Sequence, residues 1–510
     1  MSLQASPLNF DILANLFAFV DSRQDALSLM KTCRSLRAPA TPRILSFPVY
    51  LYQREEITSF CDYMLTKSSP SPQNRCHYLR RLHVLGFLGN KNGLLAQNLA
   101  KIIQNSTGLE ELVIRDIEDF LWSGGGVVFE ALSDLKSHDA LTRLELRHVS
   151  NEASRLLQAM NIKSLSELLL VFGYGSGDEP APFKLLAGLG PNLTTLSLEN
   201  AGPYSVGVQC PHVHTLDMMS CSLLPSRDLT RMFPNLVNLS FHNKFGPDDD
   251  EEIEERRVEN QAGFEADGNP WPSLQRLSGT ISHLYMFGFI FQVKFLELST
   301  VSAKKSAMCL AMIDDLSPIN LHLLIDVATF SLSELEMFLT RAFGGLTQCT
   351  YLSLSFEMDG ISLDLSDFEP MLVSVLERLK VHLLEIRIPP VYRRWTMEEL
   401  CDDDDDDDDE DDDDLTRNPF DPLDDYLCAI DTKALITTIA ERIPSLHHAG
   451  LWIGNQSRTG GYWEIVRIPG GENKEQVASG TISLTRVCDF NGRRRTLYGI
   501  PEIGELGNKN

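Results

Sequence analysis

The sequence of 510 residues contains no apolar run of the roughly 20 residues that a membrane-spanning helix needs. Its first residues lack a basic segment followed by an apolar run and a small-residue cleavage site, so we expect no signal peptide. The ten cysteines form no C-x-x-C pair, and such scattered use is typical of a reducing compartment rather than of a disulfide scaffold. The sequence therefore predicts an intracellular protein of the cytoplasm, the nucleus or both, with no membrane partner.

Motifs that carry chemistry are also missing. The sequence has no G-x-S-x-G, H-E-x-x-H or G-K-[ST] motif, so we expect neither an enzyme nor a cofactor. Cys210, His212 and His214 alternate as if on one face of a strand, but no second ligand pair follows nearby, and we expect no metal site. Lysine and arginine form no large block that could displace counterions from phosphates, so nucleic acid is not an expected partner.

Negative charge is abundant but concentrated. Residues 402–414 contain thirteen consecutive acidic residues, and residues 248–255 contain seven more. These twenty residues account for most of the formal net charge of −26. We expect the longer tract to be disordered because its charges repel one another, and to act either as a ligand for basic partners or as a solubilising insertion.

A short pattern, L-x-x-L-x-L, returns along most of the chain. Its clearest copies lie at 78–87, 108–117, 140–149, 164–173 and 192–201. Weaker copies lie at 212–221, 235–244, 273–282, 292–301, 319–327, 349–358, 382–390 and 445–454. Most steps between copies are close to the period of 20–29 residues that leucine-rich repeats show. The middle position is leucine in twelve of the thirteen copies, at residues 82, 112, 144, 168, 196, 216, 239, 277, 296, 324, 352 and 384.

Each copy predicts a strand, because alternation sends the first, fourth and sixth positions to one buried face and the residues between them to the other. Segments between copies, such as 93–106 and 152–161, have the apolar spacing of helices. The predicted fold class is therefore α/β, a leucine-rich-repeat solenoid with parallel strands on the inner face and helices outside. An ordinary α/β sheet protein is the alternative.

We expect three parts along the chain. Residues 1–50 form a short all-α segment, and residues 51–455 form the irregular repeats, with acidic insertions at 248–255 and 402–414. A helix is expected over 425–446, ending at Pro444. Residues 456–510 contain the strand-like pieces YWEIVRI, TISLTRV and RRTLYGI, which predict a β-rich cap on the end of the repeats.

The N-terminal segment has helical apolar spacing at Leu8, Ile12, Leu13, Leu16, Phe17 and Val20. A second helix is expected to begin after Ser22, a possible N-cap with Asp25 three residues later. It carries Leu27, Met30, Cys33 and Leu36, and we expect Pro39 and Pro42 to end it. So few helical residues do not make an independent core, so the segment must pack on the repeats or on another protein.

These residues resemble the F-box motif, whose pattern is roughly L-P-x-E-I-L-x-x-I-F-x-x-L followed by D-L-x-x-L-x-x-V-C-R-x-W. The corresponding residues here are Leu8 to Leu13, Leu16-Phe17, Val20, Asp25 to Leu27 and Thr32 to Arg34. Asn9 stands where the family has proline, and Leu36 stands near the expected tryptophan. With the repeats that follow, the chain resembles fungal F-box/leucine-rich-repeat proteins.

The resemblance implies a non-catalytic substrate receptor of an SCF-type E3 ubiquitin ligase. The N-terminal helices would bind the Skp adaptor, and the repeats would bind a protein substrate. The adaptor-binding residues that the resemblance implies are Leu8, Ile12, Leu13, Leu16, Phe17, Val20, Leu27, Met30 and Cys33. A helical cap on the solenoid is the alternative for this segment. For the whole chain, the alternative is an acidic leucine-rich-repeat scaffold that binds basic proteins, without ubiquitin-ligase function.

Outward positions of the early predicted strands carry arginines at residues 81, 115, 143 and 147, interspersed with His83, Glu111, Glu145, Glu167 and Glu199. Because arginine suits bidentate recognition of phosphate and carboxylate groups, Arg81, Arg115, Arg143 and Arg147 are candidate contacts for an acidic or phosphorylated partner. A solvated face whose charges form local ion pairs is the alternative.

Overall fold

The computed structural model describes residues 15–32, 34–66, 75–86, 93–160, 162–173, 185–186, 192–202, 208–222, 225–243, 249–267, 271, 274–358, 365–389, 427, 429–453, 461–468 and 481–487. The chain divides into two compact units. Unit 1 comprises residues 1–245 and 270–273, and unit 2 comprises residues 246–269 and 274–510. Both units are mixed α/β and contain mostly parallel strands.

In unit 1, each strand pairs in parallel with the next strand along the chain. Its strands are β1 (Val49–Leu51), β2 (Arg81–Val84), β3 (Glu111–Ile114), β4 (Arg143–Val149), β5 (Glu167–Phe172), β6 (Thr195–Glu199), β7 (Thr215–Met219) and β8 (Asn238–His242). Its α-helices are α2 (Arg23–Thr32), α3 (Arg37–Ser46), α4 (Arg54–Leu65), α5 (Gly93–Asn105), α6 (Ile117–Gly124), α7 (Gly126–Ser133), α8 (Asn151–Ala159) and α10 (Ser226–Met232).

In unit 2, parallel pairing in chain order continues until the last two strands, which are antiparallel. Its strands are β9 (Arg276–Thr280), β10 (Phe295–Val301), β11 (Asn320–Asp326), β12 (Tyr351–Glu357), β13 (Leu383–Ile388), β14 (His448–Ile453), β15 (Gly461–Ile468) and β16 (Thr481–Val487). Its α-helices are α11 (Asp250–Asp267), α12 (Ile281–Phe287), α13 (Ser306–Leu316), α14 (Leu332–Gly345), α15 (Leu365–Leu376) and α17 (Thr432–Arg442).

The strand positions expected from the leucine pattern are confirmed, because each of the thirteen copies contains one strand, from β2 to β14. The middle leucines pair with one another across neighbouring strands, from Leu82 to Leu239 in unit 1. In unit 1, none of these leucines is more than 2% exposed. Burying one leucine side chain contributes about 1.5–3 kcal/mol, so this row makes a large contribution to the stability of the sheet.

One position in this row was predicted wrongly. In β11 the partner of Leu296 and Leu352 is Leu321, not Leu324. Leu324 alternates to the other face of the strand and is only half-buried. The segment LHLLI has leucines at both alternation positions, so the pattern alone does not distinguish the two faces. Pairing with the two neighbouring strands sets the register.

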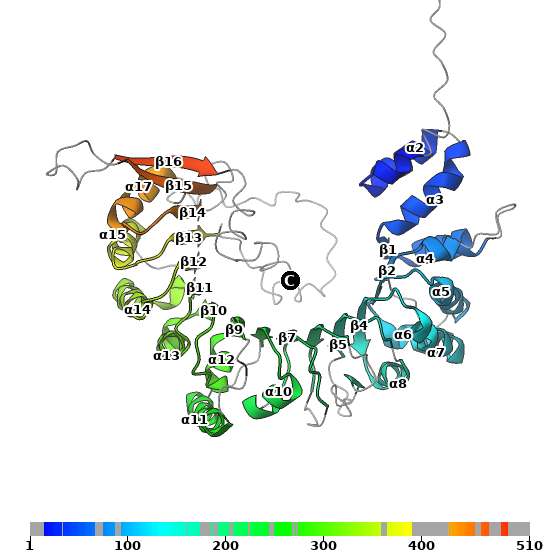
Figure 1. The fold of residues 1–510 in the computed structure, drawn as a ribbon, viewed down its shortest axis with the longest axis horizontal. Coiled ribbons are helices and arrows are strands. Elements are labelled where there is room, and N and C mark those ends of the chain that lie inside the picture. Colours follow the sequence, from blue (N-terminus) through cyan, green and yellow to red (C-terminus); the bar gives the residue numbers. More distant parts are fainter. Residues whose placement is uncertain are drawn as a thin grey trace, which may run out of the picture. The chain divides into compact units, whose positions relative to one another are not determined.

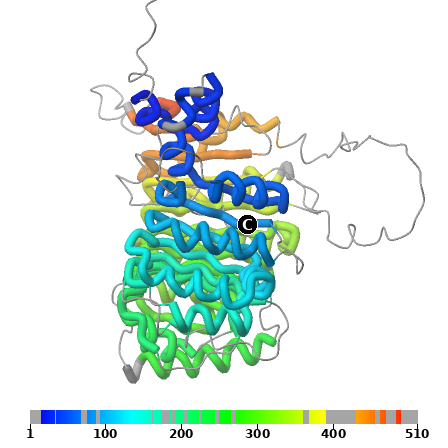
Figure 2. Tube along the Cα trace, turned by 90° about the vertical axis from the view of Figure 1, so that its right-hand side faces the viewer, coloured from blue at the N-terminus to red at the C-terminus, as the bar shows by residue number. Residues whose placement is uncertain are grey.

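Helices lie on one face of each sheet, and we call the opposite face the open face (Figure 1). In α5 the buried residues Ala96, Leu99, Ala100 and Ile103 follow the spacing of an amphipathic helix, which turns this stripe toward the strands. In unit 1, helices α4 to α8 pack against one another in chain order (Figure 2). The expected helices at 93–106 and 152–161 are confirmed as α5 and α8.

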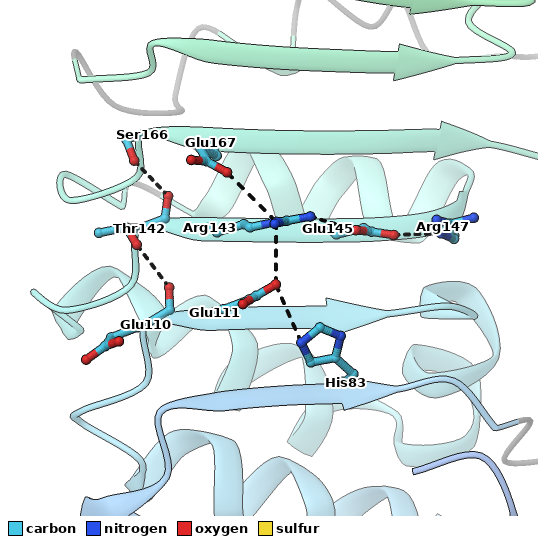
Figure 3. A network of polar contacts seen from close by, with 9 residues as sticks. All are labelled: His83, Glu110, Glu111, Thr142, Arg143, Glu145, Arg147, Ser166 and Glu167. Carbon is cyan, nitrogen blue, oxygen red and sulfur yellow. Dashed lines mark hydrogen bonds and ion pairs between the residues drawn. The ribbon is translucent and has the colours of Figure 1, made fainter. Parts of the chain in front are cut away.

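Side-chain hydroxyl groups at the start of several strands add a second link between neighbours. Thr142 Oγ1 donates to the carbonyl of Glu110 at 3.2 Å, and Ser166 Oγ donates to the carbonyl of Thr142 at 3.2 Å (Figure 3). Thr194 Oγ1 continues the series by donating to the carbonyl of Ser166 at 3.1 Å. Each hydroxyl adds a further donor to a carbonyl that already accepts backbone N–H groups, as the Glu110 carbonyl does from Thr142 and Arg143.

The N-terminal helices begin as expected but end differently. Ser22 caps α2, since the Asp25 backbone N–H donates to Ser22 Oγ at 3.1 Å. The expected helix end at Pro39 and Pro42 is wrong, because α2 ends at Thr32 and both prolines lie inside α3. Pro39 is the third residue of α3, where its missing N–H would have no helical partner. Pro42 costs one hydrogen bond, and burial of Ala40 and Leu45 offsets that cost.

The shorter acidic run lies between β8 and β9 in the chain, where an insertion was expected. From Asp250 onward, it forms the first turns of α11, which packs on α12. The Arg257 guanidinium lies 3.9 Å from the centre of the Tyr285 ring and forms an ion pair with Asp315. The Tyr285 hydroxyl donates to Glu254 Oε2 at 2.7 Å. Acidic residues at the start of a helix also interact favourably with its dipole.

The C-terminal part contains the expected helix in a shorter form, since α17 begins after its N-cap Asp431 and ends at Arg442. Two of the three expected strand pieces form β15 and β16, and β15 pairs with β14. The third piece, RRTLYGI, and the acidic tract at 402–414 lie outside the described residues. Among the helices of the described ranges, none has the length and apolar character needed to cross a bilayer.

We predict that Leu144→Ala lowers the free energy of unfolding by about 2–5 kcal/mol, because it leaves a cavity in the fully buried leucine row. Urea unfolding followed by circular dichroism measures the change. Ser197→Ala, on the open face of β6, is the matched control and should change the free energy by less than about 1 kcal/mol. Equal effects of the two substitutions would contradict the buried row.

Candidate functional site

A network of charged side chains lies on the open face of β2 to β5 (Figure 3). Strand alternation puts these residues there, since each is next to a buried core residue of its own strand. Arg81, Glu111, Arg143 and Glu167 occupy the same register position on four successive strands. We call these four residues the alternating row, because their charges alternate in sign.

Arg143 is the centre of this network. Its Nε lies 3.5 Å from Glu111 Oε1 and 3.9 Å from Glu167 Oε2, and its Nη2 lies 3.7 Å from Glu145 Oε2. These distances are those of ion pairs rather than of hydrogen bonds. Because the Arg143 side chain is 46% exposed, water screens each pair, and each contributes little to stability on its own.

Glu145 is the buried member of the network. Its side chain is only 8% exposed and lies between Arg143 and Arg147 along β4 (Figure 3). The Nε of Arg147 donates a hydrogen bond to Glu145 Oε1 at 2.7 Å. A buried carboxylate without such partners would be strongly destabilising. The Glu145 carboxylate is therefore paired with two guanidinium groups, and the side chains left accessible beside it on β4 are positively charged.

His83 joins the network to β1. Its Nε2 lies 3.5 Å from Glu111 Oε1, and its ring centre lies 4.7 Å from that of Tyr50. Burial lowers the pKa of His83 below its ordinary value of 6.5, with Arg143 and Arg81 acting in the same direction and Glu111 and Glu145 opposing them. The imidazole is therefore mainly neutral at pH 7.

The four arginines predicted as partner contacts fall into two groups in the structure. Arg143 and Arg147 are engaged by carboxylates, as the alternative of local ion pairs expects. Arg81 and Arg115 form no ion pair with any other residue of the described ranges. Arg115 and Arg147 are exposed and Arg81 is half-buried. All four belong to the first strands of unit 1, so the predicted stripe is confined to β2–β4 and the residue after β3.

The predicted adaptor contacts are spread over different environments. Leu8, Ile12, Leu13 and Cys33 lie outside the described residues. Leu16 is 41% exposed, whereas Phe17 is part of a core formed with Ala26, Leu36 and Ala40. Val20 and Met30 pack against this core, and Leu27 is half-buried. Phe17 therefore stabilises the N-terminal helices and is not available as a surface contact.

Three exposed aromatic residues were not predicted. Phe19 is 79% exposed, and Tyr50 and Tyr52 are exposed on and just after β1. The spacing of Ile12, Leu16 and Phe19 by four and three residues could have indicated a shared helical face. The alternation in VYLY at 49–52 could have indicated a strand with aromatic residues on its open face.

Cysteine and histidine side chains of the described residues form no catalytic or metal cluster. Burial raises the pKa of Cys61, Cys309 and Cys349 to about 12 and that of Cys210 to about 11, so these thiols stay protonated and unreactive. His212 and His214 lie before β7 and not in a strand, contrary to expectation. In the described ranges, no three histidine, cysteine or carboxylate side chains gather as metal ligands.

Comparison with protein-family models and with curated proteins gives no match to this chain. The open face of unit 1 carries charged and aromatic side chains, among them Arg143 and Tyr50.

We predict that Glu111→Gln and Arg143→Gln move the pKa of His83 in opposite directions. Removing the negative charge of Glu111 should lower this pKa further, and removing the positive charge of Arg143 should raise it. NMR titration of the histidine ring protons measures both changes. His138, which faces Gln104 and Asp134 instead, is the internal control and should not shift. Movement of the His83 pKa in the same direction in both variants would contradict this network.

Proposed function

We propose that the chain is a non-catalytic substrate receptor of an SCF-type E3 ubiquitin ligase, built as a leucine-rich-repeat solenoid. The observation that carries this proposal is the pair of exposed apolar side chains, Leu16 and Phe19, on N-terminal helices that are joined directly to the repeat sheet. One part of unit 1 would bind the adaptor, and the open face would bind the substrate.

The repeat architecture is supported by the regularity of the strand pairing. Strands follow one another in chain order, and equivalent leucines meet at equivalent register positions in each unit. Stacking of units that cannot bury their apolar faces alone is the principle of a solenoid. Only every second side chain of a strand is needed for the core. The side chains between them are therefore free for recognition.

Adaptor binding is supported by the N-terminal helices. Their core, formed by Phe17, Ala26, Leu36 and Ala40, is complete without Leu16 and Phe19. Exposed large apolar side chains that are close in sequence are typical of interaction surfaces. An apolar helix face that enters a groove of a partner is a recurrent mode of recognition, and the Skp adaptor would supply that groove.

A firm connection between the helices and the sheet is what a receptor needs. The backbone N–H of Arg80, just before β2, donates to the carbonyl of Leu45 in α3 at 3.3 Å. The Arg43 guanidinium donates to the carbonyl of Val20 and stacks over the Phe47 ring at 4.7 Å. A bound substrate would therefore be held in a defined position relative to the adaptor, which raises its effective concentration without any bond chemistry by this chain.

An acidic scaffold is the second candidate, and α11 is the observation that favours it. Glu251, Glu255 and Glu259 are exposed along this helix and could attract basic proteins. This function would need neither Leu16 nor Phe19.

We predict that the full chain binds purified Skp adaptor and that Phe19→Asp or Leu16→Asp weakens binding by tenfold or more, since each places a charge in an apolar contact. Surface plasmon resonance measures the affinity. Trp122→Asp is the matched control, because Trp122 is an equally exposed aromatic residue on α6 and should leave the affinity unchanged.

Absence of adaptor binding by the unmodified chain would overturn the receptor proposal. If basic proteins then bound and Glu251→Gln with Glu255→Gln weakened that binding, the acidic scaffold would be the better account.

A further inference from the structure

Three large apolar side chains are exposed on helices of unit 1, on the side of the sheet opposite the open face (Figure 1). Trp122 of α6 is 74% exposed, Leu94 of α5 is 71% exposed, and Val127 of α7 is also exposed. A group of exposed apolar side chains, unlike a single one, is typical of an interaction surface. We call Leu94, Trp122 and Val127 the tryptophan patch.

A glycine corner joins two of the helices that carry the tryptophan patch. Gly125 ends α6 and begins α7, and its φ of +58° favours glycine. A Cβ atom at Gly124 would clash with the side chain of Val128, so the close approach of the two helices requires glycine there as well. Trp122 is in the last turn of α6 and Val127 is in the first turn of α7, and these two turns meet at the corner.

The start of α5 packs against the same corner. A Cβ atom at Gly93 would lie 2.8 Å from the carbonyl oxygen of Ser123, and one at Gly124 would lie 3.3 Å from the Cβ atom of Ala96. Leu94 follows Gly93 in this first turn of α5. The three helix turns that carry the tryptophan patch therefore meet at Ser123 and Gly124.

Charge around the tryptophan patch is negative. Residues 116–134, which include α6 and α7, contain five acidic residues and no basic residue. The Glu118 carboxylate is used inside unit 1, since it accepts from two backbone N–H groups at the start of α8. Glu130 is exposed, shares a face of α7 with Val127, and forms no ion pair within the described part of the chain. A ligand that complements this surface has positive charge beside its apolar groups.

We propose that the tryptophan patch binds an amphipathic segment of a partner protein, in which large apolar side chains lie beside lysine or arginine. Leu94 and Val127 would contact the apolar side chains. A guanidinium or ammonium group can stack over the exposed ring of Trp122, and the Glu130 carboxylate can pair with a cation of the same segment. The site lies on the helices and not on the open face, so it is independent of the proposed receptor function.

Fluorescence anisotropy of the full chain with three pools of labelled peptides tests the proposal. The apolar–basic pool has leucine, phenylalanine and arginine at fixed positions and is degenerate elsewhere. The apolar–acidic pool has glutamate in place of arginine, and the polar–basic pool has serine in place of leucine and phenylalanine. Because both kinds of contact are needed, the apolar–basic pool should bind at least tenfold more tightly than either of the other pools.

Substitutions locate the binding. Trp122→Ser and Leu94→Ser should each weaken binding of the apolar–basic pool by tenfold or more, whereas Trp122→Phe should retain part of the affinity because it keeps an aromatic ring. Glu130→Gln should weaken binding about threefold and reduce its dependence on salt. Met337→Ser is the matched control, because Met337 is an exposed apolar residue on α14 of unit 2, and it should leave the affinity unchanged. Unchanged thermal unfolding of each variant excludes loss of the fold.

The proposal is overturned if the apolar–basic pool binds no more tightly than the other two pools, or if Met337→Ser and Trp122→Ser have equal effects. Loss of binding in Glu251→Gln with Glu255→Gln, and not in Trp122→Ser, would assign the basic peptides to α11 instead. The Skp adaptor affinity of Trp122→Ser is measured in parallel and should be unchanged. Failure of the tryptophan patch is thereby distinguishable from failure of the receptor function.

Discussion

Burial of one apolar residue per parallel strand at a common register position, leucine in most strands, is the constraint on which the rest of each unit depends. Because side chains alternate along a strand, a shift of one residue would turn a buried leucine such as Leu144 to the open face and expose it to water. The same register aligns the hydroxyl groups of Thr142 and Ser166 with the preceding carbonyl groups. Helices such as α5 then cover the face where the leucines lie, and the outward residues need not contribute to folding.

Because the residues of the open face are not needed for the core, their charges can be arranged in different ways. Where arginine and glutamate alternate, as at Glu111 and Arg143, opposite charges lie beside one another on neighbouring strands. Further along the same strands, Arg147 donates to Glu145, whereas the exposed Arg115 forms no ion pair within the described part of the chain. Between these positions, the buried Glu145 pairs with both Arg143 and Arg147 along β4.

Leucine spacing predicted the strands well, because the alternating apolar residues of each copy share one face when the segment forms a strand. β1 was missed, since VYL is short and carries no copy of the pattern, although Val49 pairs with Leu82 in the same buried row. The wrong position at Leu324 has the related cause that adjacent leucines obscure the alternation. Pro42 within α3 shows local preference yielding to burial of the neighbouring residues. Alternation also assigned the arginines to one face. Which of them form ion pairs depends on how different strands pair, and the sequence of a single strand does not determine that pairing.

Identical register across parallel strands also fixes the spacing of the side chains that a chain lying across them would meet. Side chains of the open face recur about every 4.8 Å from strand to strand, whereas residues of an extended chain recur about every 3.3 Å. The two spacings coincide again after two strands and three residues, so a partner crossing β3, β4 and β5 would meet the same row in phase only at every third residue. Such a face therefore favours partners whose contacting residues recur at every third position. It disfavours uninterrupted runs of one residue type.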